Sequence, residues 1–150
     1  SMYEKVLPED HDACDIYTGL LQDRNALIAN INRYEARAKV GAAPMYNYVF
    51  CREAPSRMMK AIHGVEVPFV FDNAVYAPEM WNADTRVTAM QVSEATGAAW
   101  AAFARTGNPS NPYMPAWKPY DNVDRYTMSI DVECKLVSDY RKEIREFLGR

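Results

Sequence analysis

The short run Met45–Phe50 constrains what this chain can fold into more than any other feature of its sequence. It is rich in aromatic and β-branched residues, follows Gly-Ala-Ala-Pro directly, and has too little polar alternation for a half-exposed strand. Such a run is typical of a strand buried in a parallel sheet, which needs neighbouring strands on both sides and helices on both faces. The remaining residues, or a longer polypeptide, must therefore supply that sheet.

Two segments have the residue spacing of amphipathic helices. Between Asp23 and Gly41 the apolar residues recur at helical intervals, and Gly41 is placed as the C-terminal stop. A longer pattern over Asp84–Thr106 ends at Gly107 in the same way. The positions expected to face inward in this longer helix are Val87, Met90, Ala95, Ala99, Trp100 and Phe103.

The C-terminal part of the sequence predicts a hairpin followed by a helix. Tyr126–Ile130 and Cys134–Val137 are short strand-like runs joined by an acidic link. Ser138 or Asp139 can cap a final helix. The apolar side of that helix is expected to carry Tyr140, Ile144, Phe147 and Leu148.

These elements are too few to enclose a buried parallel strand. The sequence yields two to four strands and three helices, and more than thirty residues separate the sheet-forming runs. A second apolar run, Val65–Phe71, is interrupted by Pro68, and Asn108–Tyr120 holds four prolines that exclude regular structure. We therefore expect an α/β fold in which this chain is one piece of a larger sheet.

Charge and hydropathy exclude several classes of partner. The net charge is −3, and Lys and Arg are scattered, so no basic patch predicts nucleic acid or an anionic membrane as partner. No apolar run approaches the ~20 residues that cross a bilayer, and no basic-then-apolar leader opens the chain. Because Ser1-Met2 is typical of an expression remnant, the location in the cell stays open, with the cytoplasm favoured.

The cysteines predict neither a disulfide framework nor a metal site. Cys14, Cys51 and Cys134 are odd in number, widely spaced and outside any Cys-x-x-Cys motif, so buried thiols are expected. His11 and Cys14 would share a helix face, but two candidate ligands do not make a metal site. No metal is therefore expected.

One stretch carries a specific motif. It reads Ala61-Ile-His63-Gly64-Val-Glu66-Val-Pro68-Phe69-Val-Phe71 and follows the strand Tyr46-Asn-Tyr-Val-Phe50 by about a dozen residues. It resembles the histidine loop of type-B carboxylesterases, the family that also includes cholinesterases and para-nitrobenzyl esterases. In that loop His-Gly is followed by an acid, an aliphatic residue, Pro, an aromatic residue, Val and Phe.

A second stretch resembles the same family. Trp100–Pro109 is similar to its Trp-x-x-Phe-Ala-x-Thr-Gly-x-Pro signature, and Trp117–Tyr120 is similar to its later Trp-Pro-x-Tyr, with Lys118 inserted. Aromatic residues at helical spacing on an Ala-rich helix usually pack in the core, so these are expected to be core residues rather than the lining of a binding groove.

The resemblance implies an α/β-hydrolase fold, of which residues 1–150 form the C-terminal part with the last strands of the central sheet. The family's Gly-x-Ser-x-Gly nucleophile elbow and its triad acid lie upstream of such a segment, and no Gly-x-Ser-x-Gly occurs here. It also implies hydrolysis of a small-molecule carboxylic ester through an acyl-enzyme, without metal or organic cofactor. The chain alone is expected to be inactive, and its partner is the upstream remainder of the same esterase.

His63 is the candidate catalytic residue. A serine hydroxyl is too weak an acid to attack an ester unaided, so an imidazole within hydrogen-bond reach must accept its proton and later return one to the leaving alcohol. A lone histidine between apolar runs is more often structural. The Ala-x-His-Gly-x-Glu context, through the resemblance, favours the general base instead.

The resemblance also indicates roles for the neighbours of His63. Gly64 is expected to shape the turn, and Glu66 to support the histidine loop through hydrogen bonds rather than to act as the triad acid. A solvated carboxylate is the alternative for Glu66. Phe69 and Phe71 are candidates to line the acyl or alcohol pocket, since ester pockets are largely apolar, although packing against the sheet is the safer interpretation.

Two other functions stay open. The cholinesterase-like family includes adhesion proteins that have lost triad members, so the parent could be a catalytically silent interaction protein, although the presence of His63 argues against it. A freestanding small α/β domain is the second alternative. Its exposed sheet edge and apolar faces would then be covered by self-association of the isolated chain.

Overall fold

The chain folds into two compact units. The computed structural model that shows them describes residues 2–7, 9–41 and 43–149. The first, which we call the helical unit, comprises Ser1–Ala43, Asp121–Arg125 and Asp139–Arg150. The second, the sheet unit, comprises Pro44–Tyr120 and Tyr126–Ser138. No helix in the part of the chain that the structure describes is long and apolar enough to cross a membrane.

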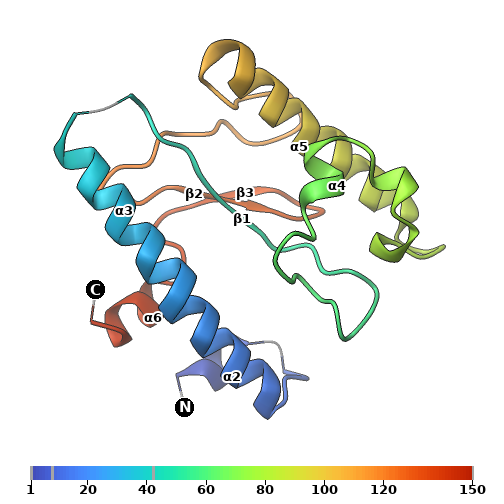
Figure 1. Ribbon diagram of the computed structural model, residues 1–150, viewed down its shortest axis with the longest axis horizontal. Helices are drawn as coiled ribbons and strands as arrows, with labels where there is room; N and C mark the ends of the chain where they lie inside the picture. Colours follow the sequence, from blue (N-terminus) through green and yellow to red (C-terminus); the bar gives the residue numbers. More distant parts are fainter. Residues whose placement is uncertain (1, 8, 42, 150) are drawn as a thin grey trace. The chain divides into compact units, whose positions relative to one another are not determined.

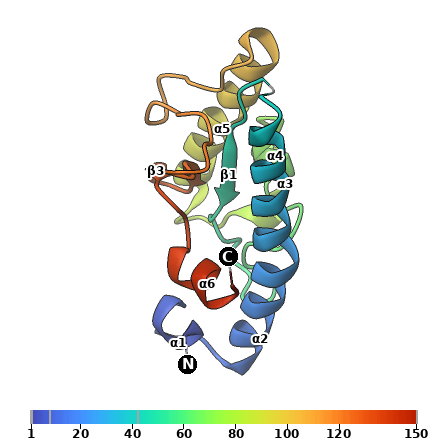
Figure 2. The same ribbon diagram turned by 90° about the vertical axis from the view of Figure 1, so that its left-hand side faces the viewer.

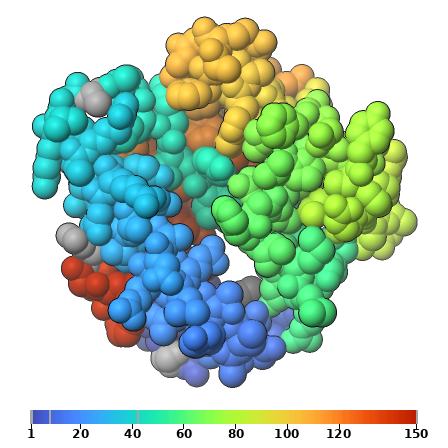
Figure 3. All heavy atoms as spheres, in the orientation of Figure 1, coloured from blue at the N-terminus to red at the C-terminus, as the bar shows by residue number. Residues whose placement is uncertain are grey.

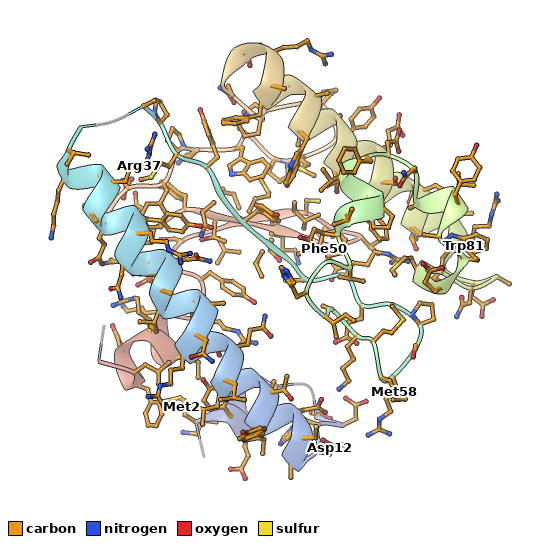
Figure 4. The ribbon with its side chains drawn as sticks, in the orientation of Figure 1. Met2, Asp12, Arg37, Phe50, Met58 and Trp81 are labelled. Atoms are coloured by element: carbon orange, nitrogen blue, oxygen red, sulfur yellow. The ribbon has the colours of Figure 1, made fainter. Side chains whose placement is uncertain are left out.

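Helices make up the regular structure of the helical unit. They are Tyr3–Val6 (α1), Ala13–Gln22 (α2), a π-helical turn over Asp23–Leu27 (η1), Ile28–Lys39 (α3) and Lys142–Phe147 (α6). Figure 2 shows α2 continuing into α3 as one rod. The rod begins at Asp12, labelled in Figure 4, because the Asp12 carboxylate accepts the backbone N–H groups of Cys14 and Asp15 at 2.8 and 3.0 Å.

Ion pairs join separate segments of the helical unit. Arg141 pairs with Asp23 of η1, and Arg125 pairs with Glu35 of α3 at 3.1 Å. Within the C-terminal segment, Arg145 donates to both carboxylate oxygens of Asp139, at 2.9 and 2.6 Å. The large hydrophobic side chains of this unit that are buried are, among the described residues, Tyr3, Ile31 and Ile144, and of these Ile144 is fully buried.

A three-stranded sheet lies at the centre of the sheet unit. Its strands are Asn47–Phe50 (β1), Thr127–Ile130 (β2) and Lys135–Val137 (β3), in the order β1-β2-β3. Figure 1 shows them side by side; β1 pairs with β2 in parallel, and β2 pairs with β3 antiparallel. The predicted C-terminal hairpin and the α/β class are therefore confirmed.

Helices and turns of the sheet unit enclose one apolar core. They are Val67–Val70 (α4), the 3-10 turns Ala74–Tyr76 (η2) and Pro78–Met80 (η3), and Arg86–Thr106 (α5). In the space-filling view of Figure 3, the green residues around α4 lie against the yellow residues of α5. Phe69, Met128 and Ile130 are nearly inaccessible in this core. The small side chains of Ala89 and Ala99 on α5 let neighbouring segments approach the helix closely.

β1 differs from its prediction in length and burial. It spans Asn47–Phe50 rather than Met45–Phe50, and it is partly exposed instead of buried, with Tyr48 36 % exposed. The reason is its place in the sheet, since β1 lies at an edge and pairs with β2 alone among the described strands. The parallel pairing is as predicted, but the second neighbour that a buried strand needs is not among the described residues.

The helix predicted to end at Gly107 is confirmed, because Gly107 terminates α5 with φ of 75°. Ala95 and Ala99 are buried, as predicted. The inward assignment is wrong for Val87 and Phe103, which are 66 % and 48 % exposed. Both lie near the ends of α5, outside the stretch from Ala89 to Ala99 that contains its buried residues.

The final helix exists but begins later than predicted. α6 starts at Lys142, and neither predicted cap, Ser138 or Asp139, begins it. The Asp139 carboxylate is engaged by an arginine of the helix itself and is therefore unavailable as a cap. Ile144 is buried as predicted, whereas Phe147 is 60 % exposed.

The cysteines are free thiols. The predicted burial is wrong for Cys14, which is exposed, while Cys51 and Cys134 are partly buried. His11 precedes the first residue of α2, so it does not share a helix face with Cys14. No group of three or more His, Cys, Asp or Glu side chains among the described residues could hold a metal ion.

Candidate functional site

His63 lies on a tight turn between β1 and α4. The backbone N–H of Val65 donates to the carbonyl of Ile62 at 3.1 Å, which closes the turn with His63 and Gly64 at its central positions. Gly64 has φ of 88°, and a positive φ at the second central position is typical of a type II turn. No heavy atom lies within 4 Å of the place where a Gly64 side chain would begin. Glycine is therefore favoured here by backbone conformation and not by lack of space.

Buried side chains next to the turn attach it to the core. Val65 is 5 % exposed and Phe69 is 1 % exposed. The Phe69 ring packs against Phe50, labelled in Figure 4, with 5.1 Å between ring centroids. On the preceding side, the N–H of Ala54 donates to the carbonyl of Lys60 at 3.0 Å and closes the loop that leads to the turn. The turn is thus held from both sides while its apex stays in solvent.

The His63 side chain is exposed. Within the described part of the chain its imidazole makes no hydrogen bond and no ion pair. In the neutral imidazole one ring nitrogen donates and the other accepts a hydrogen bond. Both nitrogens of His63 are therefore available to groups that the described residues do not supply.

Glu66 caps α4 through its backbone. Its carbonyl accepts the N–H groups of Phe69 and Val70, each at 2.9 Å. Its carboxylate makes no hydrogen bond with any residue that the structure describes. The support of the histidine loop by this carboxylate stays a prediction.

The phenylalanines predicted to line an ester pocket lie in different surroundings. Phe69 is enclosed in the core, which agrees with the alternative interpretation that it packs against the sheet. Phe71 is 72 % exposed and can contact a group outside this chain. The pocket-lining role stays a prediction for both residues.

An apolar hollow of about 190 Å³ lies between β1 and α5, away from the residues of the histidine turn. Its lining includes rings that meet edge to face, such as Tyr48 and Trp100 with 4.9 Å between centroids. Trp117, predicted to be core, is 5 % exposed. The residues that line the hollow are Tyr46, Tyr48, Ala99, Trp100, Phe103, Pro109 and Trp117.

Sequence reasoning missed Arg52, a cation buried directly after β1. Arg52 is 6 % exposed, its Nη2 donates to the carbonyl of Thr85 at 3.4 Å, and its guanidinium lies 5.8 Å from the centroid of the Phe69 ring. Burial lowers the pKa of Arg52, and the Asp131 carboxylate acts in the opposite direction. No signal in the sequence marks this burial, because an arginine beside an acidic, Pro-containing loop is typical of a solvated surface.

The chain is similar in sequence to esterases. The model of the carboxylesterase family matches residues 5–147. The para-nitrobenzyl esterase of Bacillus subtilis is 34 % identical over 116 residues, which are 75 % of this chain and 23 % of that protein. The human cocaine esterase is 33 % identical over 98 residues, 61 % of this chain and 17 % of that protein.

Solved structures agree with the sequence matches. A Geobacillus stearothermophilus carboxylesterase aligns with a TM-score of 0.82 at 25 % identity, over 97 % of this chain and 30 % of that chain. A para-nitrobenzyl esterase aligns with a TM-score of 0.66 at 33 % identity, over 77 % of this chain and 24 % of that chain. The chain thus spans no more than about a quarter of the curated relatives it matches. The resemblance found in the histidine loop is confirmed, and the chain belongs to the carboxylesterase family.

Proposed function

We propose that this chain is the C-terminal segment of a serine carboxylesterase and that it supplies the general base, His63, for the hydrolysis of carboxylic esters. The observation that carries the proposal is the position of His63 at the exposed apex of an anchored turn, with no partner for either ring nitrogen among the described residues. Membership of the carboxylesterase family supports the substrate class.

The chemistry requires an imidazole that is fixed in place but open to its partners. One ring nitrogen accepts the proton of a serine hydroxyl as that oxygen attacks the ester carbonyl, and then returns a proton to the departing alcohol. Water repeats the sequence on the acyl-enzyme and releases the acid. The second ring nitrogen donates to a carboxylate, which holds the imidazole in the correct tautomer.

The serine, the acid and the oxyanion hole would come from the rest of a longer polypeptide. The relatives are several times longer than this chain, which covers 23 % of the para-nitrobenzyl esterase of Bacillus subtilis. In α/β-hydrolases the triad residues follow one another as serine, acid and histidine, so a segment with the histidine lies downstream of the other two. The sequence itself contains no Gly-x-Ser-x-Gly. The 150-residue chain by itself is therefore expected not to turn over esters.

The test is steady-state hydrolysis of para-nitrophenyl acetate by the full-length polypeptide that carries this chain. His63→Ala should lower kcat/KM by ~10²–10⁴-fold, the usual contribution of a general acid–base residue. The matched control is His11→Ala, which removes the other histidine of the chain and should leave kcat/KM unchanged. Because the His63 side chain is exposed among the described residues, its replacement removes no packing within this chain.

The outcomes separate the esterase from a silent relative. Activity that survives His63→Ala would contradict the proposed role of His63. A full-length protein without activity, whose upstream elbow lacks the serine, would instead be a catalytically silent interaction protein of the same family.

A further inference from the structure

Both ends of the segment that carries His63 are attached to the same helix, α5. This histidine segment, residues 51–72, leaves β1, forms the turn at His63 and ends just after α4. Its regular structure is limited to the four residues of α4, which lies along α5 in Figure 1. A segment with so little regular structure takes its position from its contacts, and besides the packing of Val65 and Phe69 these include one contact at each end.

Arg52 makes the attachment at the first end. Its Nη2 donates to the carbonyl of Thr85, the residue that precedes α5, at 3.4 Å. Its guanidinium also lies over the ring of Phe69 in α4. One buried side chain therefore links the beginning of the histidine segment to α4 and to the start of α5.

Asp72 makes the attachment at the second end. α4 ends in a Schellman motif, in which the N–H of Asn73 donates to the carbonyl of Pro68 at 2.9 Å and that of Asp72 to the carbonyl of Phe69 at 3.2 Å. The motif places Asp72 at φ of 50°, a conformation that glycine usually occupies and that Asp tolerates better than most residues. This conformation directs the side chain of Asp72 to α5.

The surface of α5 is shaped to receive that side chain. The hydroxyl of Ser93, which is 2 % exposed, donates to Oδ1 of Asp72 at 2.9 Å. One helical turn later, Gly97 leaves the space that Asp72 occupies, since a Cβ at Gly97 would lie 2.9 Å from the Cβ of Asp72. Non-bonded carbons prefer ~3.5–4.0 Å, so any side chain at Gly97 would displace the end of the histidine segment.

We propose that α5 positions the general base: Arg52 and Asp72 fix the two ends of the histidine segment on this helix and so set the place of His63. The inference rests on the proposed function. A general base must lie within hydrogen-bond reach of the proton it takes, and a displacement of ~1 Å can cost on the order of 100-fold in rate. Because α5 is a helix of 21 residues whose middle part, from Ala89 to Ala99, is packed in the core, it is a stiffer support than the loop it holds.

The decisive variant is Gly97→Ala in the full-length enzyme, with kcat measured per active site titrated by a fluorophosphonate. Gly97→Ala should lower kcat per titrated site on the order of 10- to 100-fold, with KM little changed. Gly19→Ala is the matched control, because Gly19 lies within α2 and its added Cβ would meet no atom closer than 3.4 Å. It should leave kcat unchanged.

A second substitution, at Asp72, distinguishes a positioning role of α5 from a general loss of folded structure. Asp72→Gly removes the Cβ that an alanine at position 97 would meet, and glycine accepts the positive φ. Asp72→Gly also removes the hydrogen bond to Ser93, so alone it should lose kcat several-fold, and the double variant Asp72→Gly/Gly97→Ala should have that same kcat, above that of Gly97→Ala. Ser93→Ala should cause a several-fold loss, because it removes one hydrogen bond and leaves the packing in place.

The alternatives give different results. If Gly97→Ala lowers only the number of titratable sites, and each remaining site keeps the wild-type kcat, α5 has a merely structural role and the inference is overturned. A loss that Asp72→Gly does not rescue would overturn it as well. Failure of the proposed function would be seen separately, as full activity in His63→Ala.

Discussion

The helical unit is stabilised by interactions of a different kind from those within the sheet unit. In the sheet unit, one cluster of buried apolar side chains joins β2, α4 and α5. It includes Phe69, Met128 and Ile130. The helical unit buries few apolar side chains and relies on pairs such as Asp23–Arg141 and Asp139–Arg145. The turn that carries His63 belongs to the sheet unit.

This difference between the two units indicates which of them can hold a general base in a fixed position. Close-packed apolar interiors resist displacement, and salt screens contacts between exposed charges more than it affects apolar packing. The net contribution of an ion pair is smaller, because desolvation of the charges opposes their attraction. A turn attached to the apolar cluster therefore keeps its geometry under conditions that weaken the helical unit.

The largest expected effect on stability is that of Phe69→Ala. It removes a ring that is 1 % exposed and packed against Phe50, so it should destabilise the sheet unit by ~3–5 kcal/mol. The matched control is Phe71→Ala, two residues along and 72 % exposed, which should change stability by less than ~0.5 kcal/mol. Peptide-resolved hydrogen–deuterium exchange of the full-length protein measures both. Equal effects would show that the core is not where the structure has it.

Asp23→Asn should have the next largest effect, in the helical unit. It removes a carboxylate that is 6 % exposed from its pair with Arg141, and because Arg141 is itself 25 % exposed we expect a cost of only ~1–3 kcal/mol in the free energy of opening. The control is Glu133→Gln in the sheet unit, since the Glu133–Lys135 pair is largely in solvent and should contribute little. If the amide hydrogens of the helical unit exchange in both variants at the wild-type rate, ion pairs do not stabilise this unit.

Alkaline pH should weaken the helical unit through Tyr3. Burial, together with the Asp23 carboxylate, raises the pKa of Tyr3 from 10.0 to about 12. The folded state therefore favours the neutral phenol, and this contribution to stability is complete below pH 10 and is lost as the pH rises from 10 toward 12. Tyr3→Phe should remove that part of the pH dependence. The same alkaline loss in Tyr3→Phe would contradict this assignment.

The smallest effect is a difference in thiol reactivity. Cys14 in the helical unit is exposed, whereas burial raises the pKa of Cys134 in the sheet unit and lowers its thiolate fraction. Brief alkylation with iodoacetamide, followed by mass spectrometry, should modify Cys14 before Cys134. The reverse order would mean that the segment before β3 opens more readily than the exposed face of α2.

Local signals in the sequence predicted the elements that depend on neighbours along the chain. The end of α5 follows from Gly107, which adopts the positive φ that stops a helix, and the hairpin follows from strand-like runs separated by a short acidic link. The motif around His63 and Gly64 could be compared with a family because it is contiguous in the sequence, and the roles of both residues stay predictions. Gly64 was expected to shape the turn, and it lies at the second central position of a turn with φ of 88°.

Features that depend on distant residues could not be predicted. β1 is partly exposed because it pairs with β2 alone among the described strands, and Arg52 is buried by Phe69 and Thr85, which are 17 and 33 positions along the chain. The bond between Asp72 and Ser93 joins residues 21 positions apart. No periodicity of either segment indicates such a contact.

The central claim is that this chain provides a base for a nucleophile located elsewhere in the polypeptide. It is tested most directly by labelling the full-length protein with a fluorophosphonate, finding the modified residue by mass spectrometry and comparing labelling rates. We predict modification of a serine upstream of residue 1, at a rate that falls ~10²–10⁴-fold in His63→Gln and is unchanged in His11→Gln. Modification within these 150 residues, or a rate unaffected by His63→Gln, would contradict the account.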